Sequence, residues 1–217
     1  MANNKQQHRT SNEQHCTSCD ILQREILALK ADLSEMKQHA YHDSLTGLSN
    51  RRFFVESLES RIARCQRDGD HCALLLLDVD NLKATNDEHG HAAGDFLLVR
   101  LAELLKRHTR TSDVVARIGG DEFGLLLDNL DCDQVVAKIA FLARQFATAI
   151  CVHEGKPLPL GAAIGYCLVG PQDTIDGLMS RADAAMYLAK DRPRKTQPIA
   201  PIDNSVRSRS DRHPVHR

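Results

Sequence analysis

Residues 114–127 read VVARIGGDEFGLLL, two apolar runs of strand length on either side of a Gly-Gly-Asp-Glu turn. Two such runs joined by a short turn that contains glycine are typical of a β-hairpin. The glycine pair permits backbone angles that other residues avoid, and it lets a ligand approach the main chain closely. The pattern therefore predicts a hairpin that presents Asp121 and Glu122 at a defined turn.

An earlier apolar run, residues 73–77, has the length of a buried strand and leads into Asp78-Val79-Asp80. Alternation along a strand would place the side chains of Asp78 and Asp80 on one face. With the two acids of the hairpin turn, they make four carboxylates at two strand ends. Such oxygen ligands suit Mg²⁺, which keeps coordination positions open for phosphate oxygens. Acids at strand ends can also be merely solvated, but the glycine pair favours a metal site.

The remaining periodicity alternates between helix and strand. Helical spacing is found at 51–66, 95–108, 133–151 and 174–190, and residues 158–169 resemble a strand. Mixed helices and strands with a hairpin at mid-chain predict an α+β fold, in which helices cover a sheet. We expect the folded domain to span residues 43–195.

Composition excludes several classes of protein. The chain has 217 residues, of which 42% are hydrophobic and 26% charged, so a fully disordered, collagen-like or disulfide-scaffold protein is excluded. No apolar run approaches the roughly 20 residues of a membrane helix, so we expect no membrane span. The polar first residues resemble no signal peptide, and the seven cysteines are scattered. We therefore expect a cytoplasmic protein.

The N-terminal part divides into a polar segment, 1–18, expected to be flexible, and a helical stalk, 19–42. Apolar residues in the stalk are spaced 4, 3, 4, 3 and 4 apart, which predicts a coiled coil; an amphipathic helix packed on its own domain is the alternative. The seam consists of Leu22, Ile26, Leu29, Leu33, Met36 and Ala40. Cys16 and Cys19 form a lone C-x-x-C, which is a weak zinc signal because structural zinc needs four ligands.

The C-terminal part, 196–217, reads as a disordered basic tail. From residue 192 onward the chain carries seven Lys or Arg and two Asp, a charge of about +5, which leaves about −6 on the rest. A negative body without a zinc-finger, helix-turn-helix or basic-aromatic pattern is a poor surface for nucleic acid. We expect no nucleic-acid partner.

Neither a P-loop nor a G-x-G-x-x-G motif occurs, so phosphates would have to be held by metals, loop N–H groups and isolated cations. Five segments, in order along residues 43–195, share a further pattern. They are Asp43-x-Leu45-Thr46-Gly47-Leu48-x-Asn50-Arg51-Arg52, Asp78-Val79-Asp80-x-x-Lys83-x-x-Asn86-Asp87, Gly90-His91-x-x-Gly94-Asp95, Arg117-Ile118-Gly119-Gly120-Asp121-Glu122-Phe123 and Arg181-Ala182-Asp183-x-Ala185-Met186-Tyr187-x-Ala189-Lys190. Together they resemble the GGDEF-domain diguanylate cyclases.

The resemblance implies a fold like the palm of adenylyl cyclases, with a mainly antiparallel sheet flanked by helices. It implies an enzyme that condenses two GTP molecules into cyclic di-GMP with release of two pyrophosphates. By resemblance, Asp78, the carbonyl of Val79 and Asp121 would hold Mg²⁺ or Mn²⁺. Glu122 would add a ligand or help to deprotonate the attacking 3′-OH, and which acid is the base stays open.

The same resemblance assigns the nucleotide contacts. Asn86 and Asp95 match residues that read guanine, and His91 lies in the same segment. Lys83 matches a cation near the phosphates that could stabilise charge in the transition state. Lys190 and Arg194 match contacts to the terminal phosphates, although Pro193 replaces a glycine of the usual pattern and weakens the assignment of Arg194.

Arg110 and Asp113 have the R-x-x-D spacing of the family's product-inhibition site, and Arg64 matches a secondary contact there. A solvated Arg–Asp pair is the alternative interpretation. Since each domain would hold one GTP, the resemblance implies an active site shared across a homodimer. The residues before Asp43 are too few for a sensor domain, so we expect a partner protein or ligand to act on the stalk. A catalytically silent cyclic di-GMP receptor, or a scaffold, is the alternative function.

Overall fold

The computed structural model describes residues 21–30, 32 and 40–190. The chain divides into two units, Met1–His42 and Asp43–Arg217, and each is described by itself. In the first unit, residues 21–30 are helical and expose the seam residues Leu22, Ile26 and Leu29. Leu33 and Met36 lie outside the described residues, so the coiled coil stays a prediction.

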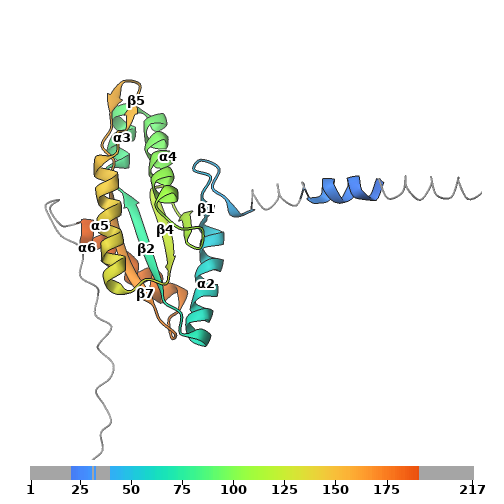
Figure 1. Cartoon of the computed structure of the whole chain (residues 1–217). Coiled ribbons are helices and arrows are strands. Elements are labelled where there is room, and N and C mark those ends of the chain that lie inside the picture. Colours follow the sequence, from blue (N-terminus) through green and yellow to red (C-terminus); the bar gives the residue numbers. More distant parts are fainter. Residues whose placement is uncertain (1–20, 31, 33–39, 191–217) are drawn as a thin grey trace, which may run out of the picture. The chain divides into compact units, whose positions relative to one another are not determined.

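The second unit is built on a five-stranded sheet (Figure 1) with the strand order β1-β3-β4-β2-β7. Only the pairing of β1 with β3 is parallel, and the other pairings are antiparallel. The predicted hairpin and the buried strand before it are both confirmed. The strands are β1 (Ser49–Asn50), β2 (Cys72–Val79), β3 (Val114–Arg117), β4 (Glu122–Asp128) and β7 (Ala162–Val169).

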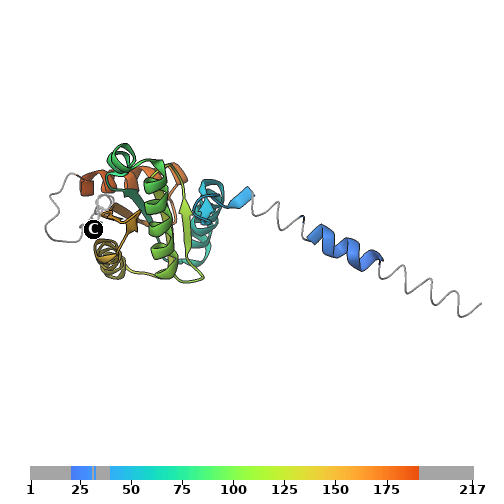
Figure 2. The same ribbon diagram turned by 90° about the horizontal axis from the view of Figure 1, so that it is seen from above.

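Helices cover both faces of the sheet (Figures 1 and 2), which confirms the α+β prediction. The side chains of β2 alternate between the two faces of the sheet. Leu75 and Leu77 belong to the core cluster on one face, and Leu74 and Leu76 belong to the cluster on the other. The first cluster packs against α4 (His91–Arg107) and α5 (Cys132–Thr148). The second packs against α2 (Arg51–Asp68) and α6 (Ile175–Lys190).

Helix α6 lies unusually close to the sheet at Gly165 of β7. A Cβ atom at this position would come within 2.2 Å of the backbone nitrogen of Met186 and 2.3 Å of the carbonyl oxygen of Ala182. Both obstacles are main-chain atoms, so no side-chain rotation could relieve the clash. The glycine therefore fixes where α6 crosses the strand.

The structure differs from the sequence predictions in its short elements. Helix α3 (Leu82–His89) and the small hairpin of β5 (Val152–His153) with β6 (Lys156–Pro157) were not predicted. The helix predicted to reach residue 151 ends at Thr148, because Ala149 adopts an extended backbone conformation. Among the described residues, no helix is long and apolar enough to cross a membrane.

Candidate active site

Two of the predicted acids are neighbours across the central strand pair. In the register of β2 and β4, Asp78 stands opposite Glu122, and the N–H of Val79 donates to the carbonyl of Asp121 at 3.0 Å. Directly opposed residues of antiparallel strands point to the same face of the sheet. The structure therefore brings Asp78 and Glu122 together, with Asp121 one residue away in the turn.

A lysine from the far end of the chain already neutralises one of these acids. The ammonium of Lys190, the last residue of α6, lies 2.9 Å from Oδ2 of Asp78. Burial raises the pKa of Asp78, and Asp121 and Asp80 raise it further, whereas Lys190 opposes them. The hydrogen bond to Asp78 raises the pKa of Lys190 in turn. The site is therefore an anionic position that attracts a cation.

The arrangement of the other acids corrects one expectation. Strand β2 ends at Val79, so Asp80 lies in the following turn and not on the strand as predicted. Within the part of the chain that the structure describes, no three His, Cys, Asp or Glu side chains are gathered as metal ligands. A cation here would thus have to draw its ligands from the end of β2, from the acids of the signature turn and from main-chain oxygen, and all-oxygen ligands are compatible with Mg²⁺.

The signature turn is held tightly in place. The carboxylate of Glu122 lies over Gly119, where a Cβ atom would be 2.4 Å from Oε2, so a side chain at this position would displace the acid. Arg117 braces the same turn by donating from Nε at 3.3 Å and from Nη2 at 2.7 Å to the carbonyl of Gly120. The remaining guanidinium nitrogen, Nη1, lies 3.3 Å from the carboxylate of Asp43. Sequence analysis missed this brace, although both charged residues belong to the quoted motifs.

Asp43 is itself fixed at the start of the second unit. Its Oδ1 accepts from the backbone N–H of Thr46 at 2.8 Å and from the hydroxyl of Thr46 at 2.7 Å. Burial alone would raise the pKa of Asp43, but these bonds and the Arg117 charge lower it overall. Asp43 is therefore a charged anchor at neutral pH.

The predicted guanine contacts lie where helices α3 and α4 meet. Oδ1 of Asn86 is buried without a hydrogen-bond partner in the described structure, and it packs so closely on Gly94 that a Cβ there would be 2.0 Å away. Asp95 follows Gly94 directly and is exposed, as are His91 and Lys83. An orphaned buried acceptor is costly unless a donor arrives. The pair Asn86 and Asp95 therefore has the character of a polar subsite for a ligand that donates hydrogen bonds.

A separate pocket of about 250 Å³ contains both members of the R-x-x-D pair. The carboxylate of Asp113 accepts a hydrogen bond from the backbone N–H of Arg110 at 2.8 Å. This bond does not involve the guanidinium of Arg110. Gln134 and Lys138 of α5 also line this pocket and were missed by sequence analysis, because nothing in their spacing connects them with Arg110. Burial lowers the pKa of Lys138.

A buried ion pair supports the wall of that pocket. Arg61 of α2 donates to both oxygens of Asp128, at 2.9 and 3.0 Å, and to the carbonyl of Ser112 at 3.1 Å. Arg64, predicted as a secondary contact, does not line the pocket. Its guanidinium instead forms ion pairs with Asp128 at 3.1 Å and with Asp70 at 3.3 Å. Arg61 thereby ties α2 to the loop that carries the R-x-x-D pair.

Some predicted residues lie outside the described residues. Arg194 of the predicted phosphate contacts is among them, as are Cys16 and Cys19. Their predicted roles are untested.

Comparison with known proteins gives the family. The profile for "Diguanylate cyclase, GGDEF domain" matches residues 40–196. The bifunctional diguanylate cyclase/cyclic di-GMP phosphodiesterase MucR of Pseudomonas aeruginosa is 39% identical over 163 residues, which are 74% of this chain and 23% of MucR. The chain spans less than half of the length of the first curated relatives it matches.

Solved structures agree with this result. The coiled coil and GGDEF domain of DgcB from Caulobacter crescentus, in complex with c-di-GMP, has a TM-score of 0.75 at 24% identity and covers 80% of this chain and 93% of its own; it supports the fold. Diguanylate cyclase SiaD of Pseudomonas aeruginosa, in complex with its activator SiaC, has a TM-score of 0.69 at 29% identity, covering 86% of this chain and 72% of its own. With its antiparallel sheet and paired strand-end acids, the chain belongs to the GGDEF-domain diguanylate cyclase family.

Proposed function

We propose that this chain condenses two GTP molecules into cyclic di-GMP and two pyrophosphates. The observation that carries the proposal is the pairing of Asp78 with Glu122 across β2 and β4, with the ammonium of Lys190 on the same anionic centre. A carboxylate pair with an ammonium group beside it can hold a metal–nucleotide complex. Family membership supplies the reaction that such a centre performs.

We infer a divalent cation, Mg²⁺ or Mn²⁺, at Asp78, the carbonyl of Val79, Asp121 and Glu122. The donor set is all oxygen, and the ammonium of Lys190 marks the position as one that accepts positive charge. When bound, the cation would neutralise charge on the phosphates and lower the pKa of the attacking hydroxyl. Glu122, held over Gly119 at the turn, is then in reach of the hydroxyl as ligand or base.

The remaining substrate contacts follow from charge and hydrogen-bonding capacity. Asp95 can accept from N1–H and the exocyclic amine of guanine together, and the buried oxygen of Asn86 accepts a further donor. His91 belongs to the same segment. Adenine lacks this donor pair, so leaving these groups unpaired would select GTP over ATP. Lys83, Lys190 and Arg194 would hold the phosphates.

Each domain would bind one GTP, so the two nucleotides must meet across a homodimer. We propose that the stalk sets this pairing and that a regulatory protein can act on it. The relative SiaD is described in complex with its activator SiaC, which supports a partner of this kind. The exposed seam of residues 21–30 gives the stalk an unpartnered apolar face in its described part.

The first prediction concerns turnover. Purified protein, stripped of bound cyclic di-GMP, is incubated with GTP and Mg²⁺, and the nucleotides are separated chromatographically. Asp121→Asn and Glu122→Gln keep the side-chain shape but remove charge from the metal centre, so we expect the rate to fall by about a hundredfold or more. Asp176→Asn, an exposed acid of α6 outside the site, is the matched control. Wild-type rates in both site variants would refute the metal centre, and binding of cyclic di-GMP without turnover would identify a receptor.

The second prediction concerns the Lys190–Asp78 ion pair. Because the ammonium competes with the metal, Lys190→Met should tighten Mn²⁺ binding, measured by electron paramagnetic resonance without nucleotide. The pair is partly exposed, so we expect only a two- to fivefold change, which is about what a screened ion pair contributes. The same variant should bind a non-hydrolysable GTP analogue about tenfold more weakly. Lys83→Met, which removes an exposed lysine without this ion pair, should leave Mn²⁺ affinity unchanged; equal affinities in all three proteins would contradict the competition.

The third prediction concerns product inhibition, which we propose for the Arg110 and Asp113 pocket. A guanidinium can donate to O6 and N7 of guanine at once, and such a bidentate contact contributes about 1–3 kcal/mol. Arg110→Ala should therefore raise the cyclic di-GMP concentration for half-inhibition by about tenfold or more, with little change in the uninhibited rate. Arg107→Ala, an exposed arginine outside the pocket, is the control. If inhibition by cyclic di-GMP is unchanged in Arg110→Ala, Arg110 and Asp113 are an ordinary solvated pair and do not form an inhibition site.

The fourth prediction tests the stalk. Leu29 lies on the predicted seam and Leu27 lies off it, although both side chains are 66% exposed in the described helix. If the seam pairs two chains, Leu29→Glu should weaken dimerisation about tenfold or more in sedimentation equilibrium, because burial of a leucine is lost in each copy. Specific activity should fall with it. Leu27→Glu should change neither quantity, and identical behaviour of the two variants would exclude the seam.

A further inference from the structure

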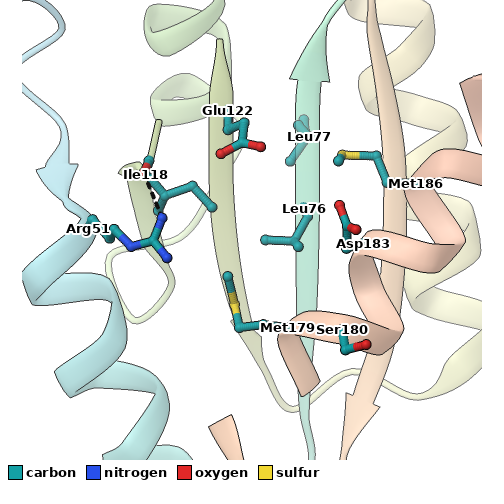
Figure 3. Close-up of a pocket in the computed structure, with 9 residues that line it drawn as sticks. All are labelled: Arg51, Leu76, Leu77, Ile118, Glu122, Met179, Ser180, Asp183 and Met186. Carbon is teal, nitrogen blue, oxygen red and sulfur yellow. Dashed lines mark hydrogen bonds between the residues drawn. The ribbon is translucent and has the colours of Figure 1, made fainter. Parts of the chain in front are cut away.

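A pocket of about 400 Å³ opens on the same face of the sheet as the acids of the candidate active site. Leu76 lines it and precedes Asp78 by two residues on β2, so both side chains project from one face. Glu122, which stands opposite Asp78, lines the pocket itself. Figure 3 shows Arg51 extending toward it from α2, with residues of α6 on the other side. We call it the α2–α6 pocket.

The α2–α6 pocket has an apolar centre and a largely polar rim. Its buried lining residues are all apolar: Leu76, Leu77, Ile118 and Met186. Its half-buried and exposed lining residues are mostly polar: Arg51, Glu122, Met179, Ser180 and Asp183. A buried apolar centre inside a polar rim is the usual pattern of a site that takes an apolar side chain from another protein segment.

The charged groups of the rim have unused bonding capacity. Arg51 donates from Nη1 to the carbonyl of Ile118 at 3.5 Å, a long bond that leaves its other N–H groups available. Within the described ranges, neither Asp183 nor Glu122 has a side-chain hydrogen bond or ion pair. With two carboxylates and one guanidinium, the rim favours a segment that carries more positive than negative charge.

The α6 side of the pocket leads directly to Lys190, the last residue of that helix. Met179, Asp183 and Met186 are spaced four and three residues apart, and Lys190 follows four residues later. Such spacing places all four side chains in one stripe along the helix. The ammonium of Lys190 lies 2.9 Å from Asp78. The chain that follows Lys190 therefore starts beside the candidate metal site, on the side of α6 that lines the pocket.

The sequence after Lys190 has the composition that this pocket favours. Residues 198–202, Pro-Ile-Ala-Pro-Ile, are its most apolar run, and three cations precede them within residues 192–195. Ile199 follows Lys190 by nine residues, which can span up to about 30 Å. Asp183, in the middle of the α6 stripe, is only about 10 Å from Lys190 along the helix axis. The chain is therefore long enough to place this run in the pocket.

We propose that the α2–α6 pocket binds residues 198–202 of the same chain, and that this contact lowers the rate of the proposed reaction. The inhibitory part rests on the proposed function. An isoleucine of the run would fill the apolar centre, and the cations of residues 192–195 would lie beside Glu122 and Asp183, where they compete with a metal ion.

Two properties of the run make even a weak contact effective. Pro198 and Pro201 have a fixed φ, so less backbone entropy is lost on binding than for an ordinary segment. Because the run is tethered to α6, its effective concentration at the pocket is of about millimolar order. A dissociation constant of about 1 mM for the free segment would therefore leave about half of the molecules with the run in the pocket.

The two methionines of the pocket allow a direct test in the full chain. The chain has four methionines, so ¹³C-methyl-methionine NMR gives four signals, and Met179→Leu and Met186→Leu identify those from the pocket. Without metal or nucleotide, the double substitution Ile199→Asp and Ile202→Asp should shift both pocket signals. Val206→Asp, which adds a negative charge outside the run, should leave them in place.

A synthetic peptide of residues 191–205 tests the same contact between molecules. Added to the double variant, it should return both pocket signals to their wild-type positions in a saturable manner, with half-saturation at about 1 mM. Asp183→Asn in this protein should weaken peptide binding about two- to fivefold, which is what an exposed ion pair contributes. Asp176→Asn, on the same helix but outside the lining, should not change it.

The rate of cyclic di-GMP formation tests the inhibitory part. The double variant should turn over about twofold faster than the wild type, because about half of the wild-type molecules would be inhibited. Val206→Asp should keep the wild-type rate. The peptide should reverse the gain of the double variant.

Each alternative result has a defined meaning. Pocket signals that are identical in the wild type and the double variant, that move equally in Val206→Asp, or that ignore the peptide would overturn the inference. Wild-type signals that change with protein concentration would identify the run of a second copy as the occupant, which overturns the intramolecular contact. An unchanged rate with an intact NMR response would overturn the inhibition. Absence of cyclic di-GMP with every variant would refute the proposed function while the contact stands.

Discussion

The antiparallel register of β2 and β4 is the constraint on which the rest of the site depends. It sets Asp78 opposite Glu122 and joins Val79 to Asp121 by a main-chain hydrogen bond. A slip of one residue would turn Asp78 to the other face of the sheet, away from Glu122 and Lys190. The buried leucines on both faces of β2 resist such a slip, because each would have to leave its own core cluster. The hydrophobic core and the position of the acids are therefore set by one pairing.

Around this pairing, two arginines connect segments that are distant in sequence. Arg117 connects the signature turn to Asp43, and Arg61 connects α2 to Asp128 and to the loop before β3. Both arginines satisfy carbonyl oxygens as well as carboxylates, so each ties together segments that are distant in sequence. The cost of desolvating such buried pairs offsets much of their attraction, so their net contribution to the stability of the fold is small.

Local patterns sufficed for the strand and hairpin that carry Asp78, Asp121 and Glu122. The hairpin, the buried strand and the long amphipathic helices follow from apolar spacing and from the glycine pair. Helix α3 was missed because its sequence, LKATNDEH, is short and has little apolar periodicity, and the β5–β6 hairpin was missed because its strands have two residues each. The ion pair of Lys190 with Asp78, and the hydrogen bond from Arg51 to the carbonyl of Ile118, depend on tertiary packing that no local spacing encodes.

The close packing of α6 on Gly165 fixes the position of the helix relative to the candidate active site. Because main-chain atoms of Ala182 and Met186 rest directly against the strand, the helix cannot slide along its axis without a collision. Asp183 and Lys190 are seven residues apart on this helix, about 10 Å along its axis at 1.5 Å per residue. The position of each residue of α6 relative to the sheet is therefore fixed. Lys190, at the end of this helix, therefore keeps a constant position relative to Asp78 on the neighbouring strand β2.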